Sequence, residues 1–193
     1  MTRLFVAYLR ERFPLAIYGP AITLHVAAAL WATALRPTLV SLARPAGFAA
    51  LLLLQFRLWD DLEDRERDRA AHPNRVLVRN VPAPFRLALI ALAIGNLALF
   101  AIAGSVAATA GVALLDLSFW LAYRRVRPRV GDGIWRFSVL LIKYPAFVGL
   151  LATTTGALAP DRLLVAVLGV YACACAYEAV HDRRTLVVGE TSC

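Results

Sequence analysis

The residues best suited to chemistry lie in one short charged segment, residues 57–69. Its acidic side chains are Asp60, Asp61, Glu63, Asp64, Glu66 and Asp68. On a helix, Asp61, Asp64 and Asp68 are spaced by three and four residues, so they share one face. Asp60 adds to this face from its edge. Carboxylates crowded on one helix face repel one another unless a positive charge lies between them.

This set of oxygen ligands, without histidine or cysteine, is typical of a site for a hard cation. Mg²⁺ commonly binds one or two carboxylates and completes its coordination with water and phosphate oxygens. We therefore expect Asp60, Asp61, Asp64 and Asp68 to bind Mg²⁺ and to clamp a diphosphate, with Asp61 and Asp64 as the catalytic pair. The alternative is a solvated face on which the interleaved arginines, Arg65, Arg67 and Arg69, pair with the acids.

The elements that must position these residues are predicted to be membrane helices. Of the 193 residues, 60% are hydrophobic and only 18% are charged, whereas soluble domains are less apolar and more charged. Stretches of about 20 apolar residues are long enough to cross a bilayer. The sequence predicts a single all-α domain over residues 1–193, an integral membrane bundle of about six spans: 14–35, 46–59, 85–103, 106–123, 134–158 and 163–180. Residues 1–13 are expected to form an amphipathic helix at the membrane surface.

The arginines predict the orientation of these spans. The net charge is +8, and most basic residues fall in the N-terminal segment, the connection after the second span and the loop near residues 124–132. Since basic loops remain on the cytoplasmic side, both termini and the acidic segment are expected there, in a cytoplasmic membrane. The same topological rule explains the positive charge without a nucleic-acid partner.

The run Asp60-Asp61-x-x-Asp64-x-x-x-Asp68, followed by Pro73-x-Arg75, resembles the first aspartate-rich signature of the UbiA superfamily of membrane prenyltransferases. Val76 and Asn80 differ from the residues usual in that family. The resemblance implies Mg²⁺-dependent transfer of a prenyl group from an isoprenoid diphosphate to an unidentified small-molecule or lipid acceptor. It also implies that Arg75 binds the diphosphate, as guanidinium groups suit phosphate oxygens.

The resemblance further implies a second acidic cluster at the end of the sixth span. There the chain has Glu178 and Asp182, spaced i,i+4, which are expected to hold a second Mg²⁺. His181 is a less favoured candidate for a general base.

Ionisable residues inside spans are costly unless they have partners. Lys143 is expected either to bind diphosphate or to neutralise Asp116, and these alternatives remain open. Asn96 is expected to form a hydrogen bond between helices.

Two other functions compete with the enzyme. The second cluster departs from the family pattern, and the predicted spans are fewer than the superfamily commonly has. These departures favour a non-catalytic homologue that binds prenyl lipid or serves as a subunit, with a second copy or another protein as partner. A CDP-alcohol phosphotransferase is disfavoured, because its signature needs glycine-spaced aspartates and no glycine lies between Gly47 and Gly95.

Overall fold

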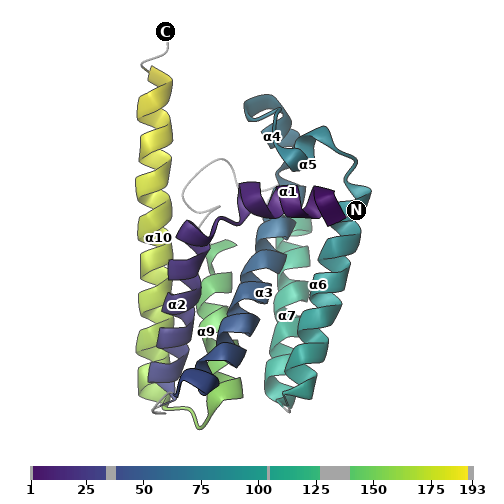
Figure 1. The fold of residues 1–193 in the computed structure, drawn as a ribbon. Helices are drawn as coiled ribbons and strands as arrows, with labels where there is room; N and C mark the ends of the chain where they lie inside the picture. Colours follow the sequence, from purple (N-terminus) through teal and green to yellow (C-terminus); the bar gives the residue numbers. More distant parts are fainter. Residues whose placement is uncertain (1, 34–37, 104, 127–139, 191–193) are drawn as a thin grey trace.

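The computed structural model describes residues 2–33, 38–103, 105–126 and 140–190, and every regular element in these ranges is a helix (Figure 1). The long helices are α2 (Leu15–Ala32), α3 (Leu39–Glu63), α6 (Ala83–Ile102), α7 (Val106–Leu121), α9 (Lys143–Thr155) and α10 (Pro160–Glu190). The shorter elements are α1 (Thr2–Arg12), α4 (Arg65–Ala71), α5 (Val76–Arg79) and the π-helical turn η1 (Ala122–Val126). The all-α expectation is confirmed over these residues.

The long helices run alongside one another, and the short helices gather at one end of the bundle (Figure 1). Helix α2 packs against α3, α9 and α10, while α6 packs against α3 and α7. Helix α1 crosses the upper end in Figure 1, and α4 and α5 lie above it. We refer to this end as the polar end, because the acidic segment lies there.

Within the described residues, four helices are long and apolar enough to cross a membrane: Leu15–Thr33, Ala83–Ile102, Val106–Val126 and Pro160–Val180. They correspond to the expected spans 14–35, 85–103, 106–123 and 163–180. The expected span 46–59 is not among them, and neither is the described part of 134–158, of which residues 134–139 lie outside the described structure. Helix α3 has charged residues near both ends, and α9, with 13 residues, is about 20 Å long against a hydrocarbon core of about 30 Å.

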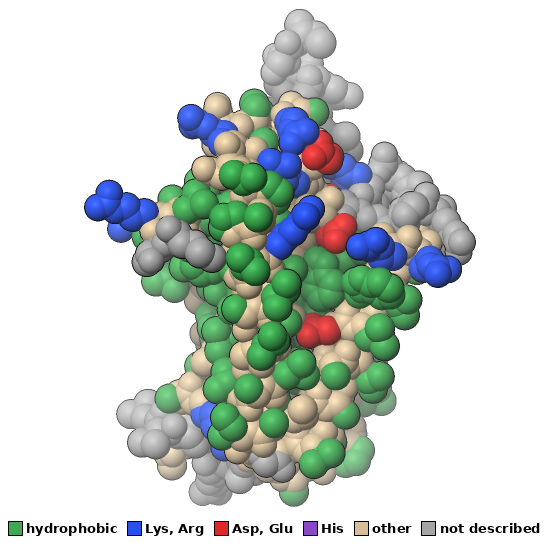
Figure 2. All heavy atoms as spheres, turned by 90° about the vertical axis from the view of Figure 1, so that its right-hand side faces the viewer, with side chains coloured by type: hydrophobic (Ala, Val, Ile, Leu, Met, Phe, Trp, Pro, Cys, Tyr) green, Lys and Arg blue, Asp and Glu red, His purple; other side chains and the backbone are tan. Residues whose placement is uncertain are grey.

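The outer surface of the bundle is largely hydrophobic. Large apolar side chains are exposed on α6 and α10, among them Leu87, Ile90, Ile94, Leu164 and Leu168. Figure 2 shows a hydrophobic belt on one face, with most of the Lys and Arg side chains above it. A helix that is apolar on both its inner and outer faces is typical of a membrane protein, so the chain has the character of an integral membrane bundle.

Aromatic side chains fill the interior. Phe56 of α3 contacts Phe119 edge-on, with ring centroids 4.9 Å apart, and lies 5.3 Å from the ring of Phe147. A second cluster, formed by Tyr8, Leu58, Leu77 and Phe85, fixes α1 to the bundle. The two clusters meet α3 on different faces, Phe56 in the first and Leu58 in the second, so α3 joins the core of the bundle to the packing of α1.

Pro145 accounts for the start of α9. The helical turn at Leu140 and Leu141 is interrupted at Ile142, three residues before the proline. Because proline has no N–H, it cannot bond to the carbonyl of Leu141. The helix is therefore interrupted before the proline, and Lys143 begins α9.

Candidate functional site

The acidic segment follows one nearly continuous helical path, although α3 ends at Glu63 and α4 begins at Arg65. The N–H of Asp64 donates to the carbonyl of Asp60 at 2.9 Å, and the N–H of Asp68 donates to that of Asp64 at 2.8 Å. These i,i+4 bonds are helical, so three aspartates lie one above another on the same face. We call Asp60, Asp64 and Asp68 the acidic row.

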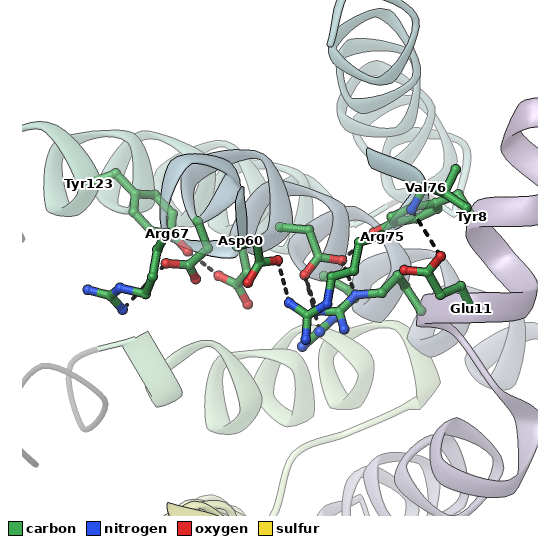
Figure 3. Close-up of polar contacts among 12 residues, drawn as sticks. Tyr8, Glu11, Asp60, Arg67, Arg75, Val76 and Tyr123 are labelled. Carbon is green, nitrogen blue, oxygen red and sulfur yellow. Dashed lines mark hydrogen bonds and ion pairs between the residues drawn. The ribbon is translucent and has the colours of Figure 1, made fainter. Parts of the chain in front are cut away.

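Each carboxylate of the acidic row has a basic partner. Figure 3 shows Asp60 between Tyr123 and Arg67 on one side and Arg75 on the other. Asp60 accepts from the ammonium group of Lys143 on α9 and from the hydroxyl of Tyr123 on η1. Asp68 pairs with Arg75, whereas Asp64 lies 3.7 Å from the Arg67 guanidinium.

These pairs differ in exposure. The Lys143 side chain is 5% exposed and that of Asp64 is 35% exposed. Among the row carboxylates themselves, Asp60 is 21%, Asp64 is 35% and Asp68 is 13% exposed, so the middle one is the most open to solvent.

Asp61 lies apart from the acidic row, with its own set of partners. Its side chain is 6% exposed and turns toward α1. Arg12 binds both carboxylate oxygens, at 2.6 and 2.9 Å, and the Tyr8 hydroxyl donates at 2.9 Å. Arg57, one turn earlier on α3, lies 3.1 Å away. Asp60, expected at the edge of the acidic face, lies in the row, while Asp61 fastens the surface helix to the bundle.

Burial controls the protonation of this anchor. It raises the pKa of the Asp61 carboxyl to about 7, although the Arg57 guanidinium and the hydrogen bond from Tyr8 act in the opposite direction. Burial, together with the adjacent Asp61, also raises the pKa of the Tyr8 hydroxyl far above its usual range. Tyr8 therefore remains protonated and acts as a hydrogen-bond donor.

The segment after α4 folds back over the polar end, which brings Arg75 to the acidic row. Arg65 of α4 donates to the carbonyls of Leu77 and Asn80 on either side of the end of α5, at 3.2 and 3.1 Å. The N–H of Val76 donates to the Glu11 carboxylate of α1 at 3.0 Å. Arg75 comes directly before α5, so these contacts fix the backbone that carries its guanidinium.

The second expected cluster is described in part. Tyr144, next to Lys143 on α9, interacts electrostatically with both Asp60 of α3 and Glu178 of α10. Glu178 thus belongs to the same electrostatic neighbourhood as the row. The side chains of His181 and Asp182 lie outside the described part of the structure.

Lys143 and Asp116 do not neutralise each other. Lys143 pairs with Asp60, while Asp116 accepts a hydrogen bond from the amide of Gln55 at 2.7 Å. Lys143 therefore belongs with the acidic row, and Asp116 with a separate polar contact between α3 and α7.

Oxygen donors for a metal are present, but they are spread along the helix. Within the described ranges, no group of three or more His, Cys, Asp or Glu side chains is arranged to hold a metal ion. The row carboxylates therefore stand as single oxygen donors, each held by its own cation.

Several partners of the acidic segment escaped prediction. Arg57 precedes Asp61 by one helical turn, and this i,i+4 spacing is a signal that the sequence does contain. Arg12, Tyr8 and Tyr123 have no such signal, because each is about 50 or more residues away from its aspartate. Only the packing of α1 and η1 on α3 brings them there.

The fold and the site define a class of protein: an all-helical bundle of membrane type, with a row of paired carboxylates at one end. No protein-family model, curated protein or solved structure matches the chain.

Proposed function

We propose that the protein is a membrane prenyltransferase of the UbiA type, which uses Mg²⁺ to transfer a prenyl group from an isoprenoid diphosphate to an acceptor. The observation that supports this most is the acidic row, which has Lys143 and Arg75 beside it at the polar end of an apolar bundle. In this proposal the polar end faces the cytoplasm, and both termini are cytoplasmic.

The row carboxylates Asp60, Asp64 and Asp68 would hold Mg²⁺, and Glu178 with Asp182 would hold a second ion. Bound Mg²⁺ neutralises charge on the departing diphosphate. In this proposal Asp61 positions α1 through Arg12 and Tyr8 in place of binding Mg²⁺, which departs from the metal-binding role expected from the sequence.

Two cations of the site are suited to bind the diphosphate. Lys143 and Arg75 now neutralise Asp60 and Asp68, respectively. If Mg²⁺ takes over these carboxylates, both cations become available for phosphate oxygens. Fixed positive groups aimed at a leaving group stabilise the charge that develops on it.

The bundle supplies the remaining requirement, a dry environment. Phe56, Phe119 and Phe147 are buried directly below the row. An apolar interior accommodates the isoprenoid tail and excludes the water that would quench an allylic cation.

The test measures Mg²⁺-dependent release of diphosphate from labelled farnesyl diphosphate. The protein is reconstituted in liposomes, with a membrane lipid extract as the source of acceptor. Substituting Asp64→Asn should lower the rate by on the order of 100-fold. The matched control is Glu63→Gln, an exposed neighbour outside the row, which should retain wild-type turnover. Equal rates for the two variants would reject the assignment.

A non-catalytic lipid-binding homologue is the second candidate, since every row carboxylate already has a cationic partner. Such a protein would bind farnesyl diphosphate equally well with Mg²⁺ and with EDTA, and would release no diphosphate. Tighter binding in Mg²⁺, lost in Asp64→Asn, would instead favour the enzyme.

A further inference from the structure

A chain of three polar side chains crosses the interior of the bundle. Asn96 of α6 donates through Nδ2 to Oε1 of Gln55 on α3, at 2.6 Å. Gln55 in turn donates through Nε2 to Oδ1 of Asp116 on α7, at 2.7 Å. Gln55 is 0% exposed and Asn96 is 1% exposed. The hydrogen bond expected between helices at Asn96 is thereby confirmed, and we call these residues the interior triad.

The interior triad lies at membrane depth. Asp116 is the midpoint of the candidate span Val106–Val126, and Asn96 lies within the candidate span Ala83–Ile102. Polar groups at this depth are costly unless they are satisfied. Hydrogen bonds between membrane helices are individually weak, so a purely structural role gives little reason to place an ionisable residue here.

The direction of the chain follows from the carboxylate. An ionised Asp116 only accepts hydrogen bonds, so it orients the Gln55 amide with Nε2 toward itself. The Gln55 oxygen then receives the Nδ2 group of Asn96. This order leaves Asn96 Oδ1 buried and, among the described residues, without a hydrogen-bond partner.

Asp116 also differs from the aspartates of the polar end. Asp60, Asp61 and Asp68 are each paired with a cation. Asp116 instead receives an uncharged amide at Oδ1, and among the described residues its Oδ2 has no hydrogen-bond partner. The interior triad thus offers two acceptors, Asn96 Oδ1 and Asp116 Oδ2, and needs a donor in an apolar setting.

We propose that the interior triad binds the hydroxyl group of a molecule dissolved in the membrane, such as a phenol or a long-chain alcohol. A hydroxyl donates one hydrogen bond and keeps its apolar body in hydrocarbon, which matches a polar site surrounded by nonpolar side chains. Under the proposed function, on which this reading rests, the bound molecule is the prenyl acceptor. The binding itself requires neither Mg²⁺ nor turnover.

The experiment compares two probes that differ only in the donor, 4-octylphenol and 4-octylanisole. Saturable binding of each radiolabelled probe is measured on the full-length protein in lipid nanodiscs, above the linear uptake of empty nanodiscs. The wild type should bind the phenol about tenfold or more tightly than the ether, as expected for one hydrogen bond to a charged group. Equal affinities of the wild type for the two probes would overturn the proposal without any variant.

Variants then locate the site. Asn96→Leu and Asp116→Asn should each abolish the preference for the phenol. Ser118→Ala, at an exposed position of the same helix as Asp116, should retain it. An undiminished preference in both triad variants would contradict the assignment. Selective phenol binding without Mg²⁺-dependent diphosphate release would reject the prenyltransferase proposal and leave the binding site in place. Diphosphate release without selective phenol binding would reject the binding site alone.

Discussion

Arg12 and Asp61 form a two-point ion pair that joins α1 to the C-terminal end of α3, with Nη2–Oδ1 and Nε–Oδ2 distances of 2.6 and 2.9 Å. The two residues are 49 positions apart, and both are largely buried, at 17% and 6% exposed. Helix α1 is therefore held across the polar end by charge as well as by the packing of Tyr8.

Breaking this pair should loosen α1. Arg12→Gln removes one of the two guanidinium groups around Asp61, and Arg57 remains, so we expect a loss of about 2 kcal/mol in the free energy of unfolding. Protease cleavage after residue 12 should also become faster. Arg10→Gln, an exposed arginine of the same helix, is the control and should change neither property. If Arg12→Gln changed neither the free energy of unfolding nor the cleavage rate, the ion pair would not be what holds the helix.

The pH dependence of stability should report on Asp61. Its pKa of about 7 in the folded protein lies above the ordinary 3.8, so the folded state binds the proton more tightly than the unfolded state does. The contribution is complete below the unfolded pKa and is lost as the pH rises through about 7. Denaturation of the wild type should thus become easier from about pH 5 to about pH 8. Asp61→Asn should flatten this slope, and an unchanged slope would assign it to another group.

The Lys143–Asp60 pair can be tested with a double-mutant cycle. Lys143→Met leaves the Asp60 carboxylate without its cation and should destabilise the protein by about 3 kcal/mol. Adding Asp60→Asn should restore most of that loss. Binding of farnesyl diphosphate should remain weak in both variants if Lys143 binds the diphosphate, as measured by equilibrium dialysis with Mg²⁺ present. Recovery of binding in the double variant would limit Lys143 to a structural role.

Gly111 on α7 leaves room for the side chain of Leu150 on α9. A Cβ at Gly111 would lie 2.7 Å from Cδ2 of Leu150. Gly111→Val should therefore lower the unfolding midpoint by an amount equivalent to about 1–3 kcal/mol. Gly149→Val on α9 is the matched control, since nothing lies within 4 Å of its added Cβ. Equal effects of the two substitutions would indicate that helix propensity, and not packing, sets the cost.

Local patterns in the sequence predicted much of this protein. Apolar stretches of membrane length predicted an all-helical membrane bundle, because hydropathy and helix length are properties of contiguous residues. The i,i+4 spacing predicted that Asp64 and Asp68 share a face, and a backbone hydrogen bond bears this out. Asn96 was identified as a residue that bonds between helices for a similar reason: an amide in an apolar stretch needs a partner.

The tertiary structure decided which partner each polar group has. Asp60 and Asp61 are adjacent in sequence, but about 100° of helical rotation separates them. One therefore reaches Lys143 and Tyr123, and the other reaches α1. No local signal could assign Arg12 to Asp61 or Asp116 to Gln55, since these pairs form only when distant helices pack together. The sequence thus determined which polar residues are able to form pairs. The packing of the helices decided which pairs form, because it sets the direction and the distance of each side chain from its neighbours.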